Sequence, residues 1–176
     1  MELTARDLLL RPWREDDVAA YWTALESPAG RLWHGSTLGS RDDVAAMLAR
    51  RRDWSTGDHA SWCVTGPAGE LLGSLSLSLH RIDLDQRDAE IGYWTAPESR
   101  GRGIAVRAVD AAVRWGFTGL GLLRVQLFHA VENVASARVA AKAGFRQEGR
   151  LRRSHRYGDG QWHDELLWAR LADDPA

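Results

Sequence analysis

The segment from Ala89 to Val106, AEIGYWTAPESRGRGIAV, constrains the fold more than any other part of the chain. Its first seven residues alternate with the period of two that indicates a strand, which ends before Pro97 because proline cannot donate to a sheet ladder. A loop containing Gly101 and Gly103 follows, and a helical pattern begins at once. Glycines let a ligand approach the backbone closely, and the first N–H groups of a helix have no partner within it. The segment therefore predicts a phosphate-binding loop between a strand and a helix.

The spacing of the glycines narrows the kind of phosphate group that this loop could bind. A dinucleotide fingerprint, G-x-G-x-x-G, would need a glycine at Val106 and an acidic residue after the strand expected at 124–129. A P-loop, G-x-x-x-x-G-K-[ST], is absent from the sequence. The string that is present, R-x-x-G-x-A at Arg100, Gly103 and Ala105, resembles the acyl-CoA pyrophosphate loop of the GCN5-related N-acetyltransferase (GNAT) family. The plainer interpretation is a surface loop of glycine and arginine before an ordinary helix.

The size and composition of the chain exclude several classes of protein. With 176 residues the chain has the length of one domain, which we place at residues 1–171, with a C-terminal tail at 172–176. A net charge of −1 and a pI of about 6.6 indicate no general polyanion-binding surface, so we expect no nucleic-acid partner. Cys63, the only cysteine, permits no intramolecular disulfide, fits a reducing compartment and is expected in the core. No apolar run has the length of a signal peptide or a membrane-spanning helix, so we expect a cytoplasmic protein without membrane association.

The rest of the chain predicts the order strand, two helices, three strands, helix, strand, helix and two strands. Expected helices begin at the acidic residues 15–17, at Ser40, at Gly103 and after Asn133. The sequence Ser-Pro-Ala-Gly at 27–30 is expected to end the first helix. This order indicates a mixed α/β sheet, with parallel strands where helices cross over between strands. The expected strands cover residues 8–10, 61–65, 71–79, 89–95, 122–129, 145–155 and 161–171, with a charged loop at 80–88.

A second motif begins thirty residues after Gly103. The string N-x-x-S-x-x-V-x-x-K-x-G-F, from Asn133 to Phe145, resembles the last helix of the GNAT family, which packs beside the pantetheine arm of the cofactor. The opening LRPW before an acidic helix start, and Y-x-D-G at 157–160, are similar to the branch that acetylates the N-terminal alanine or serine of ribosomal proteins. Because two motifs occur at the family's usual separation, the chain is identified as a member of this family.

The resemblance implies a fold and a set of contacts to acetyl-CoA. The fold would be a mixed, largely antiparallel central sheet with a parallel pair at the acyl-CoA cleft, flanked by about four helices. In the family, backbone groups after the central strand bind pantetheine, and the N–H groups of the glycine loop bind the pyrophosphate. The asparagine that begins the last helix bonds the pantetheine amides, and it could act here as a plain helix cap as well, or instead. By position, these residues are Tyr93, Trp94, Thr95 and Ala96; Arg100, Gly101, Arg102, Gly103, Ile104 and Ala105; and Asn133.

Two further groups of residues have two interpretations each. Arg138 and Lys142 lie one turn apart on the last expected helix and could contact the nucleotide phosphate, or could form a solvated helix face. Trp22, Trp33 and Trp54 belong to the helical segment that borders the acceptor side in the family. They could form an aromatic pocket for an amine through cation–π contacts, or they could fill the core.

Transfer of an acyl group to an amine needs a base, because an ammonium ion is not a nucleophile. Glu90 on the central strand is the leading candidate, acting through a water molecule. The alternative for Glu90 is a carboxylate near the strand start that is held by an arginine. His80 and His129 are the second choices for the base. None of the six histidines has the spacing of a metal-binding motif, so we expect no metal.

The leaving thiolate needs a proton, and this sequence offers two candidates to supply it. Much of the family has a tyrosine seven residues after the asparagine, and here that position is Ala140. Ser136 resembles the serine of the ribosomal-protein branch and could hydrogen-bond the sulfur, or could bond the local backbone instead. Tyr157 is a poorer candidate because it is expected at a hairpin turn.

Together these features predict an acyl-CoA-dependent N-acyltransferase that transfers acetyl from acetyl-CoA to a primary amine by direct attack. The acceptor could be a protein N-terminus or a small molecule such as an aminoglycoside or a polyamine. The protein is expected to act as a monomer or a homodimer. The alternative is a non-catalytic CoA-binding regulatory module of the same fold, which the missing tyrosine at Ala140 keeps open.

Overall fold

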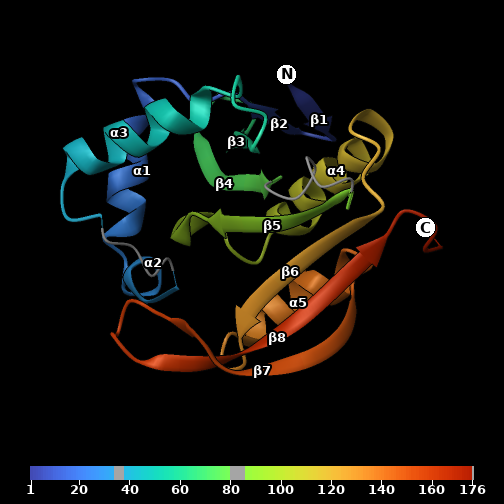
Figure 1. Ribbon diagram of the computed structural model, residues 1–176. Helices are drawn as coiled ribbons and strands as arrows, with labels where there is room; N and C mark the ends of the chain where they lie inside the picture. The colour runs from blue at the N-terminus through green and yellow to red at the C-terminus, as the bar shows by residue number, and fades with distance from the viewer. Residues whose placement is uncertain (34–37, 80–85, 176) are drawn as a thin grey trace.

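A computed structural model describes residues 1–33, 38–79 and 86–175 of the chain (Figure 1). Within these residues, eight strands form one sheet in the order β1-β2-β3-β4-β5-β6-β8-β7. Neighbouring strands are antiparallel except β5 and β6, which are parallel, so the expected mixed and largely antiparallel sheet is confirmed. The strands are β1 (Leu3–Ala5), β2 (Leu8–Arg11), β3 (His59–Thr65), β4 (Leu71–Ser78), β5 (Asp88–Thr95), β6 (Arg124–Ala130), β7 (Arg146–Arg156) and β8 (Trp162–Leu171).

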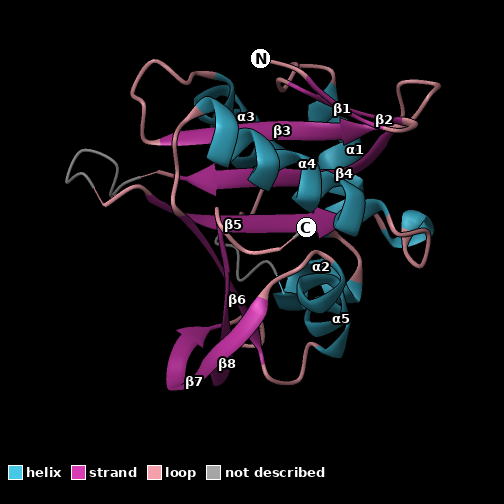
Figure 2. Cartoon of the chain, turned by 90° about the vertical axis from the view of Figure 1, so that its right-hand side faces the viewer, coloured by secondary structure: helices cyan, strands magenta, loops and turns pink. Residues whose placement is uncertain are grey.

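The helices cover both faces of this sheet. α4 contacts β1, β2, β4 and β5 on one face, whereas α1 and α3 contact β4 and β3 from the other (Figures 1 and 2). α5 lies beside α4 and β6. The described residues contain five α-helices where about four were expected, and the additional one is α2. The helices are α1 (Asp17–Leu25), α2 (Pro28–Trp33), α3 (Arg41–Arg52), α4 (Ile104–Gly119) and α5 (Val134–Lys142), with a 3₁₀ turn, η2 (Pro97–Ser99).

The alternation of β4 explains why the two faces of the sheet differ. Leu75 and Leu77 are buried in the same apolar cluster as Val109 of α4. Ser74 and Ser76 alternate with these leucines and therefore point to the opposite face. That face, which α4 does not cover, is left with polar side chains in the middle of the sheet.

The parallel pair at the centre of the sheet is short. Its register joins residues 88–90 of β5 to residues 124–126 of β6. Beyond these pairs the two strands diverge, and β6 pairs with β8 along its whole length (Figure 1). The sheet therefore has an N-terminal arm, β1 to β5, and a C-terminal arm, β6, β8 and β7, which meet over three residue pairs.

Three details of the fold differ from the sequence-based expectations. The first helix ends at Leu25 as expected, but Ser27 and Pro28 also begin α2: Ser27 Oγ accepts from the N–H of Gly30 at 3.0 Å, and proline at the first helical position has no N–H to leave unpaired. β1 was missed because three residues give no measurable period. The strands that α5 connects, β6 and β7, run in the same direction as expected, but they do not pair with each other because β8 lies between them.

Candidate active site

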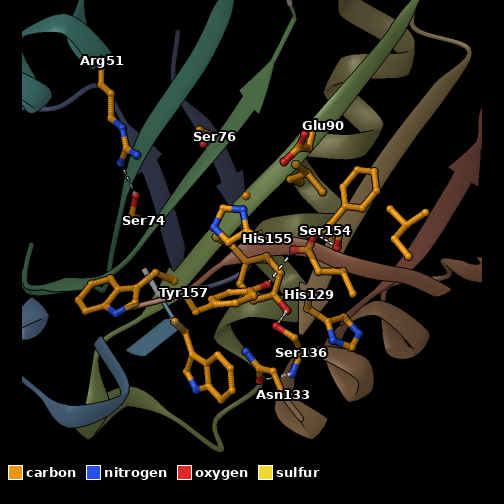
Figure 3. Close-up of a pocket in the computed structure, with 18 residues that line it drawn as sticks. Arg51, Ser74, Ser76, Glu90, His129, Asn133, Ser136, Ser154, His155 and Tyr157 are labelled. Carbon is orange, nitrogen blue, oxygen red and sulfur yellow. Dashed lines mark hydrogen bonds between the residues drawn. The ribbon is translucent and has the colours of Figure 1, made fainter. Parts of the chain in front are cut away.

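A cavity of about 540 Å³ opens where β5 and β6 diverge (Figure 3). Residues of α2, α3, β4 and β5 line one side of it, and residues of β6, α5 and the β7–β8 hairpin line the other. The cavity exists because the backbone pairing of β5 and β6 stops after Glu90 and Gln126, so no strand fills the space beyond. It therefore takes side chains from both arms of the sheet.

The register between β4 and β5 makes the floor of this cavity polar. Ser76 lies opposite Gly92, and Glu90 is two residues further along the same face of β5. Because Gly92 has no side chain, the space above Ser76 is open: a Cβ at Gly92 would lie 3.6 Å from Ser76 Oγ, an ordinary contact. Glu90, the leading candidate for the base, lines the cavity as expected (Figure 3).

A pair of hydroxyl groups joins β5 to α5 inside the cavity. Tyr93 Oη and Ser136 Oγ lie 2.8 Å apart. Asn133 caps α5 by accepting from the N–H of Ser136 at 3.1 Å (Figure 3). Burial raises the pKa of Tyr93 to about 12, more strongly than the hydrogen bond to Ser136 lowers it. The resemblance assigned Tyr93 only a backbone contact, but its side chain pairs with Ser136. Ala140, where much of the family has tyrosine, is fully buried.

The β7–β8 hairpin supplies a wall built around the buried side chain of Glu165. Tyr157 donates its hydroxyl to Oε1 of Glu165, and Ser154 donates to Oε2, both at 2.8 Å. Burial, followed by the bond to Glu165, raises the pKa of the Tyr157 hydroxyl above its ordinary value. His155 packs edge-on against Tyr157, with ring centroids 4.7 Å apart. Although Tyr157 precedes the hairpin turn, which made it the poorer candidate, its side chain is buried in the cavity wall.

This hairpin closes over the cavity because its turn packs tightly against α2. Gly158 donates its backbone N–H to the carbonyl of Leu32 at 2.9 Å. A Cβ at position 158 would overlap the carbonyl oxygen of Arg31, so only glycine permits this approach. Trp33 then packs edge-on against Tyr157, with ring centroids 5.7 Å apart.

The three tryptophans expected near the acceptor lie in three different environments. Trp33 lines the cavity. Trp22 lines a separate hollow of about 300 Å³ beside α2. Trp54 packs against the buried ring of Trp62, with centroids 5.1 Å apart, and so belongs to the core. Of the three, Trp33 therefore lies where an acceptor pocket could use it, whereas Trp54 packs against the core.

The glycine loop lies at the N-terminus of α4, outside the lining of the cavity. Gly101 and Gly103 have φ angles of 76° and 71°, which L side chains rarely adopt, and open space surrounds the Cβ position of Gly101. Gly103 is the N-cap of α4 and provides no side-chain cap, and Arg107 braces the loop by donating to the carbonyl of Arg102 at 3.0 Å. The exposed glycine backbone and uncapped helix start fit an approaching phosphate group. Ile104, in contrast, turns its side chain into the core.

The remaining residues assigned to acetyl-CoA lie around this loop and along α5. The backbone N–H of Ala96 donates to the carbonyl of Leu72 at 2.9 Å, so the fold itself uses this group. The carbonyl of Thr95 accepts from Nε of Arg100 at 3.3 Å. Trp94 lines the cavity, and Ala105 is half-buried in the first turn of α4. The side chains of Arg138 and Lys142 are exposed on α5, which agrees with either interpretation of them.

The other candidate bases are constrained by their partners. The ring of His129 is buried, accepts from Trp168 Nε1 at Nε2 (2.9 Å), and lies 2.8 Å from the carbonyl of Ala130 at Nδ1. Both nitrogens are therefore occupied by the fold. His80, with most of the charged loop at 80–88, lies outside the described residues.

Sequence reasoning missed six polar side chains of the cavity: Arg51, Ser74, Ser76, Ser154, His155 and Glu165. The alternation of the two hairpin strands could have placed Ser154 and Glu165 on faces of the sheet, but not beside β5. Arg51 gave no signal at all, because it is one of three consecutive arginines at the end of a helix.

A family model described as an acetyltransferase (GNAT) domain matches residues 7–146 of the chain. The protein therefore belongs to the GNAT acetyltransferase family. It is similar to "Putative ribosomal N-acetyltransferase YdaF" of Bacillus subtilis (strain 168), with 39% identity over 103 residues, covering 58% of this chain and 55% of the relative. It is also similar to the ribosomal-protein-serine acetyltransferase of Escherichia coli (strain K12), with 34% identity over 104 residues, covering 59% of this chain and 56% of the relative. The chain thus spans little more than half the length of these curated relatives.

A solved structure extends the similarity over the whole chain. Mycobacterium smegmatis RimJ in complex with CoA-disulfide superimposes with a TM-score of 0.84 and 29% sequence identity, covering 98% of this chain and 87% of that chain. The resemblance to the branch that contains ribosomal-protein acetyltransferases is thereby supported both in sequence and in fold.

No cluster of three or more histidine, cysteine, aspartate or glutamate side chains that could hold a metal ion occurs in residues 1–33, 38–79 and 86–175. Over the same ranges, no helix has both the length and the apolar character needed to cross a membrane. Cys63 is buried with a free thiol, as expected for a core residue, and burial raises its pKa to about 12.

Proposed function

We propose that this protein is an acyl-CoA-dependent N-acyltransferase that transfers an acetyl group from acetyl-CoA to a primary amine. The observation that carries the proposal is the cavity where β5 and β6 diverge, which is lined both by the Glu90 carboxylate and by the hydroxyl pair of Tyr93 and Ser136. A base and a proton donor in one space are what acyl transfer from a thioester to an amine needs. The relative solved with CoA-disulfide supports a donor of the CoA class.

Acetyl-CoA would be held by the two elements that border the divergence of the strands. The glycine loop, with Gly101 and Gly103, and the first N–H groups of α4 would bind the pyrophosphate. The amide NH₂ of Asn133 would bond the pantetheine arm, since the helix cap uses only the oxygen of that side chain. The exposed cations Arg138 and Lys142 would meet the nucleotide phosphate.

The reaction in this proposal is a direct attack. The acceptor amine gives a proton to Glu90, directly or through one water, and its nitrogen forms a bond to the thioester carbonyl carbon. The carbon–sulfur bond then breaks, and the leaving thiolate takes a proton from the pair formed by Ser136 and Tyr93. The proton that the new amide nitrogen releases restores the pair. The Tyr93 hydroxyl is protonated at neutral pH, as a tyrosine with its ordinary pKa near 10 would be, and the burial that raises its pKa to about 12 makes it a weaker acid.

Glu90 is preferred as the base because its side chain is exposed and lines the cavity, whereas Glu165 and His129 are buried. Both oxygens of Glu165 accept hydrogen bonds, from Tyr157 and Ser154. Both nitrogens of His129 are likewise in use. Glu90 lies on the exposed part of β5 and lines the cavity. His155, also exposed in the cavity, is the second candidate.

The acceptor that we propose is the α-amine of a protein N-terminus, as the names of the similar ribosomal-protein acetyltransferases suggest, with a small-molecule amine as the second candidate. We place this reaction in the cytoplasm, with the enzyme acting as a monomer or a homodimer. The measurement is release of free CoA thiol from acetyl-CoA across a panel of N-terminal peptides, polyamines and aminoglycosides.

The Glu90→Gln variant gives the sharpest test of mechanism. It keeps the size of the side chain and removes the base, so kcat should fall by roughly 10²–10⁴-fold. The affinity for acetyl-CoA, measured by calorimetry, should change little. Activity should recover in part above about pH 8, because the free form of an α-amine, with a pKa near 8, then becomes abundant.

A matched control is Glu98→Gln, which neutralises an exposed carboxylate of η2 outside the cavity and should retain wild-type kcat. Wild-type kcat in Glu90→Gln would move the base to His155, for which His155→Gln is the next variant. Tight binding of CoA without turnover of any amine in the panel would make the protein a CoA-binding module instead of an enzyme.

A further inference from the structure

The cavity contains one cation whose position the proposed reaction does not use. Arg50, Arg51 and Arg52 end α3, and the middle one alone lines the cavity (Figure 3). The side chain of Arg52 is about half exposed, and its Nη1 lies 3.6 Å from Oε1 of Glu15 on the outer surface. Arg51 instead extends toward the floor of the cavity above β4, at the end of the cavity away from Glu90 (Figure 3).

The hydrogen bonds of Arg51 go to neutral groups and leave most of its N–H donors without an anionic partner. Its Nη1 donates to Tyr21 Oη at 3.3 Å and to Ser74 Oγ at 3.4 Å. Both distances are at the long end for an N–H···O bond, and both acceptors are neutral. Within residues 1–33, 38–79 and 86–175, Arg51 forms no ion pair with a carboxylate. A guanidinium has five N–H donors in a fork that matches a carboxylate, so a carboxylate from outside the protein would satisfy it.

The sheet sets the spacing between this cation and the proposed base. In the register of β4 and β5, Ser74 lies opposite Trp94, whereas Ser78 lies opposite Glu90. Four residues along a strand span roughly 13 Å. Ser76 and Gly92 lie between the two charged ends, so the floor between them is polar and has no bulky side chain.

We infer that Arg51 receives an anionic group of the acceptor, so that the preferred substrate is an amine that carries a carboxylate. This inference rests on the proposed acyl transfer for the identity of the amine end. An extended peptide advances about 3.3 Å per residue, and the reach of Arg51 shortens the gap that must be spanned. The occupant that fits is an acidic N-terminus, with aspartate or glutamate at its second to fourth residue. A small amino-carboxylate of similar length shares the same chemistry.

The test uses matched peptides that begin with alanine or serine and carry glutamate, glutamine or lysine at positions two to four. The wild-type enzyme should show a kcat/KM for the glutamate peptides about tenfold or more above that for the glutamine peptides, since hydrogen bonds between charged groups are among the strongest that side chains make. Arg51→Gln should bring this ratio close to one. Arg51→Glu should favour the lysine peptides. Arg52→Gln, the neighbouring arginine on the outer surface, should keep the wild-type ratio.

A second arm replaces the peptides with ω-amino carboxylates of increasing chain length and with the corresponding uncharged amines. Dependence on Arg51 in this arm, without dependence in the peptide arm, would identify a small molecule as the acceptor. If Arg51→Gln lowers kcat/KM for charged and uncharged acceptors by the same factor, Arg51 has only a structural role and the inference is wrong. Thermal unfolding of each variant shows whether the fold is retained.

Binding separates this inference from the proposed function. Calorimetry of glutamate and glutamine peptides in the presence of CoA needs no turnover. A preference for the glutamate peptide that disappears in Arg51→Gln would support the anion site even if no amine were acetylated. Equal affinities of the two peptides for the wild-type protein would overturn it even in an active enzyme.

Discussion

Different interactions stabilise the N-terminal arm and the C-terminal arm of the sheet. In β3, six of the seven residues are buried, and the rings of Trp62, Trp54 and Trp115 pack edge to face or tilted against one another. In β7, no residue is fully buried, and nine of its eleven residues are exposed. The N-terminal arm is therefore stabilised mainly by apolar burial, whereas the outer strand of the C-terminal arm depends on its ladder with β8 and on side-chain charges.

Two ion pairs, one in the N-terminal arm and one on the C-terminal hairpin, show the same contrast. Arg11 and Asp17 in the N-terminal arm form a two-bond pair at 2.7 and 2.8 Å with both side chains about 7% exposed. Arg150 and Asp164 of the C-terminal hairpin also lie 2.8 Å apart, but the arginine is 60% exposed. Water screens the second pair and not the first. The difference teaches that the outer strand of the cavity wall rests on exposed interactions, whereas β5 and α4, which flank the glycine loop, are anchored in a packed core.

The largest expected loss of stability follows from removing a buried ring of the N-terminal arm. Trp62→Ala should lower the free energy of unfolding by about 3–5 kcal/mol, because it removes a fully buried ring and leaves a cavity between Trp54 and Trp115. Trp162→Ala is the matched control in the C-terminal arm, where the ring is 61% exposed, and it should change stability by less than about 0.5 kcal/mol. Denaturant unfolding measures both. Equal losses in the two variants would contradict the contrast between the arms.

The next largest effect concerns the buried ion pair. Asp17→Asn leaves the Arg11 guanidinium buried without its counter-ion and should cost about 3 kcal/mol of stability. The same change at Asp164, in the exposed hairpin pair, should cost less than about 1 kcal/mol. Urea unfolding at neutral pH compares the two variants, and a larger loss at Asp164 would show that the hairpin is the more tightly held arm.

The pH dependence of the same pair gives a further check. Burial opposes ionisation of Asp17, but the hydrogen bonds from Arg11 and the N–H of Arg14, together with the charge of Arg11, lower its pKa below the ordinary 3.8. The folded state therefore favours the ionised form of Asp17 more strongly than the unfolded state does. The stabilisation is fully present above pH 3.8 and is lost as the pH falls through the folded-state pKa. The stability difference between wild type and Asp17→Asn should therefore shrink on acidification in that range.

The smallest expected effect on stability is at the exposed pair of Arg150 and Asp164. Arg150→Gln should lower stability by less than about 1 kcal/mol, and added salt should reduce the difference from wild type further. Unfolding at low and high ionic strength measures this dependence. A loss above about 2 kcal/mol that persists at high salt would mean that the hairpin charges act as a buried network.

Much of the central segment could be predicted because its signals are local. The period of two in β5, the glycines before α4 and the cap at Asn133 each involve residues within a few positions of one another, and the structure has them where they were expected. The start of α2 also depends on neighbouring residues, Ser27 and Pro28, but these residue types are typical of turns as well. Its prediction failed through ambiguity and not through lack of a signal.

The site shows where local signals end. Sequence alone determined the strand, loop and helix from Ala89 to Val106 and the helix that begins at Asn133, because periodicity and capping depend on neighbouring residues. Only the tertiary structure decided that the side chain of Tyr93 meets Ser136, 43 positions later, and that Arg51 extends above Ser74. It also decided that β8 inserts between β6 and β7, which brings Glu165 into the cavity wall. Such contacts depend on how the strands divide the sheet into two arms, and no pattern within one segment contains that information.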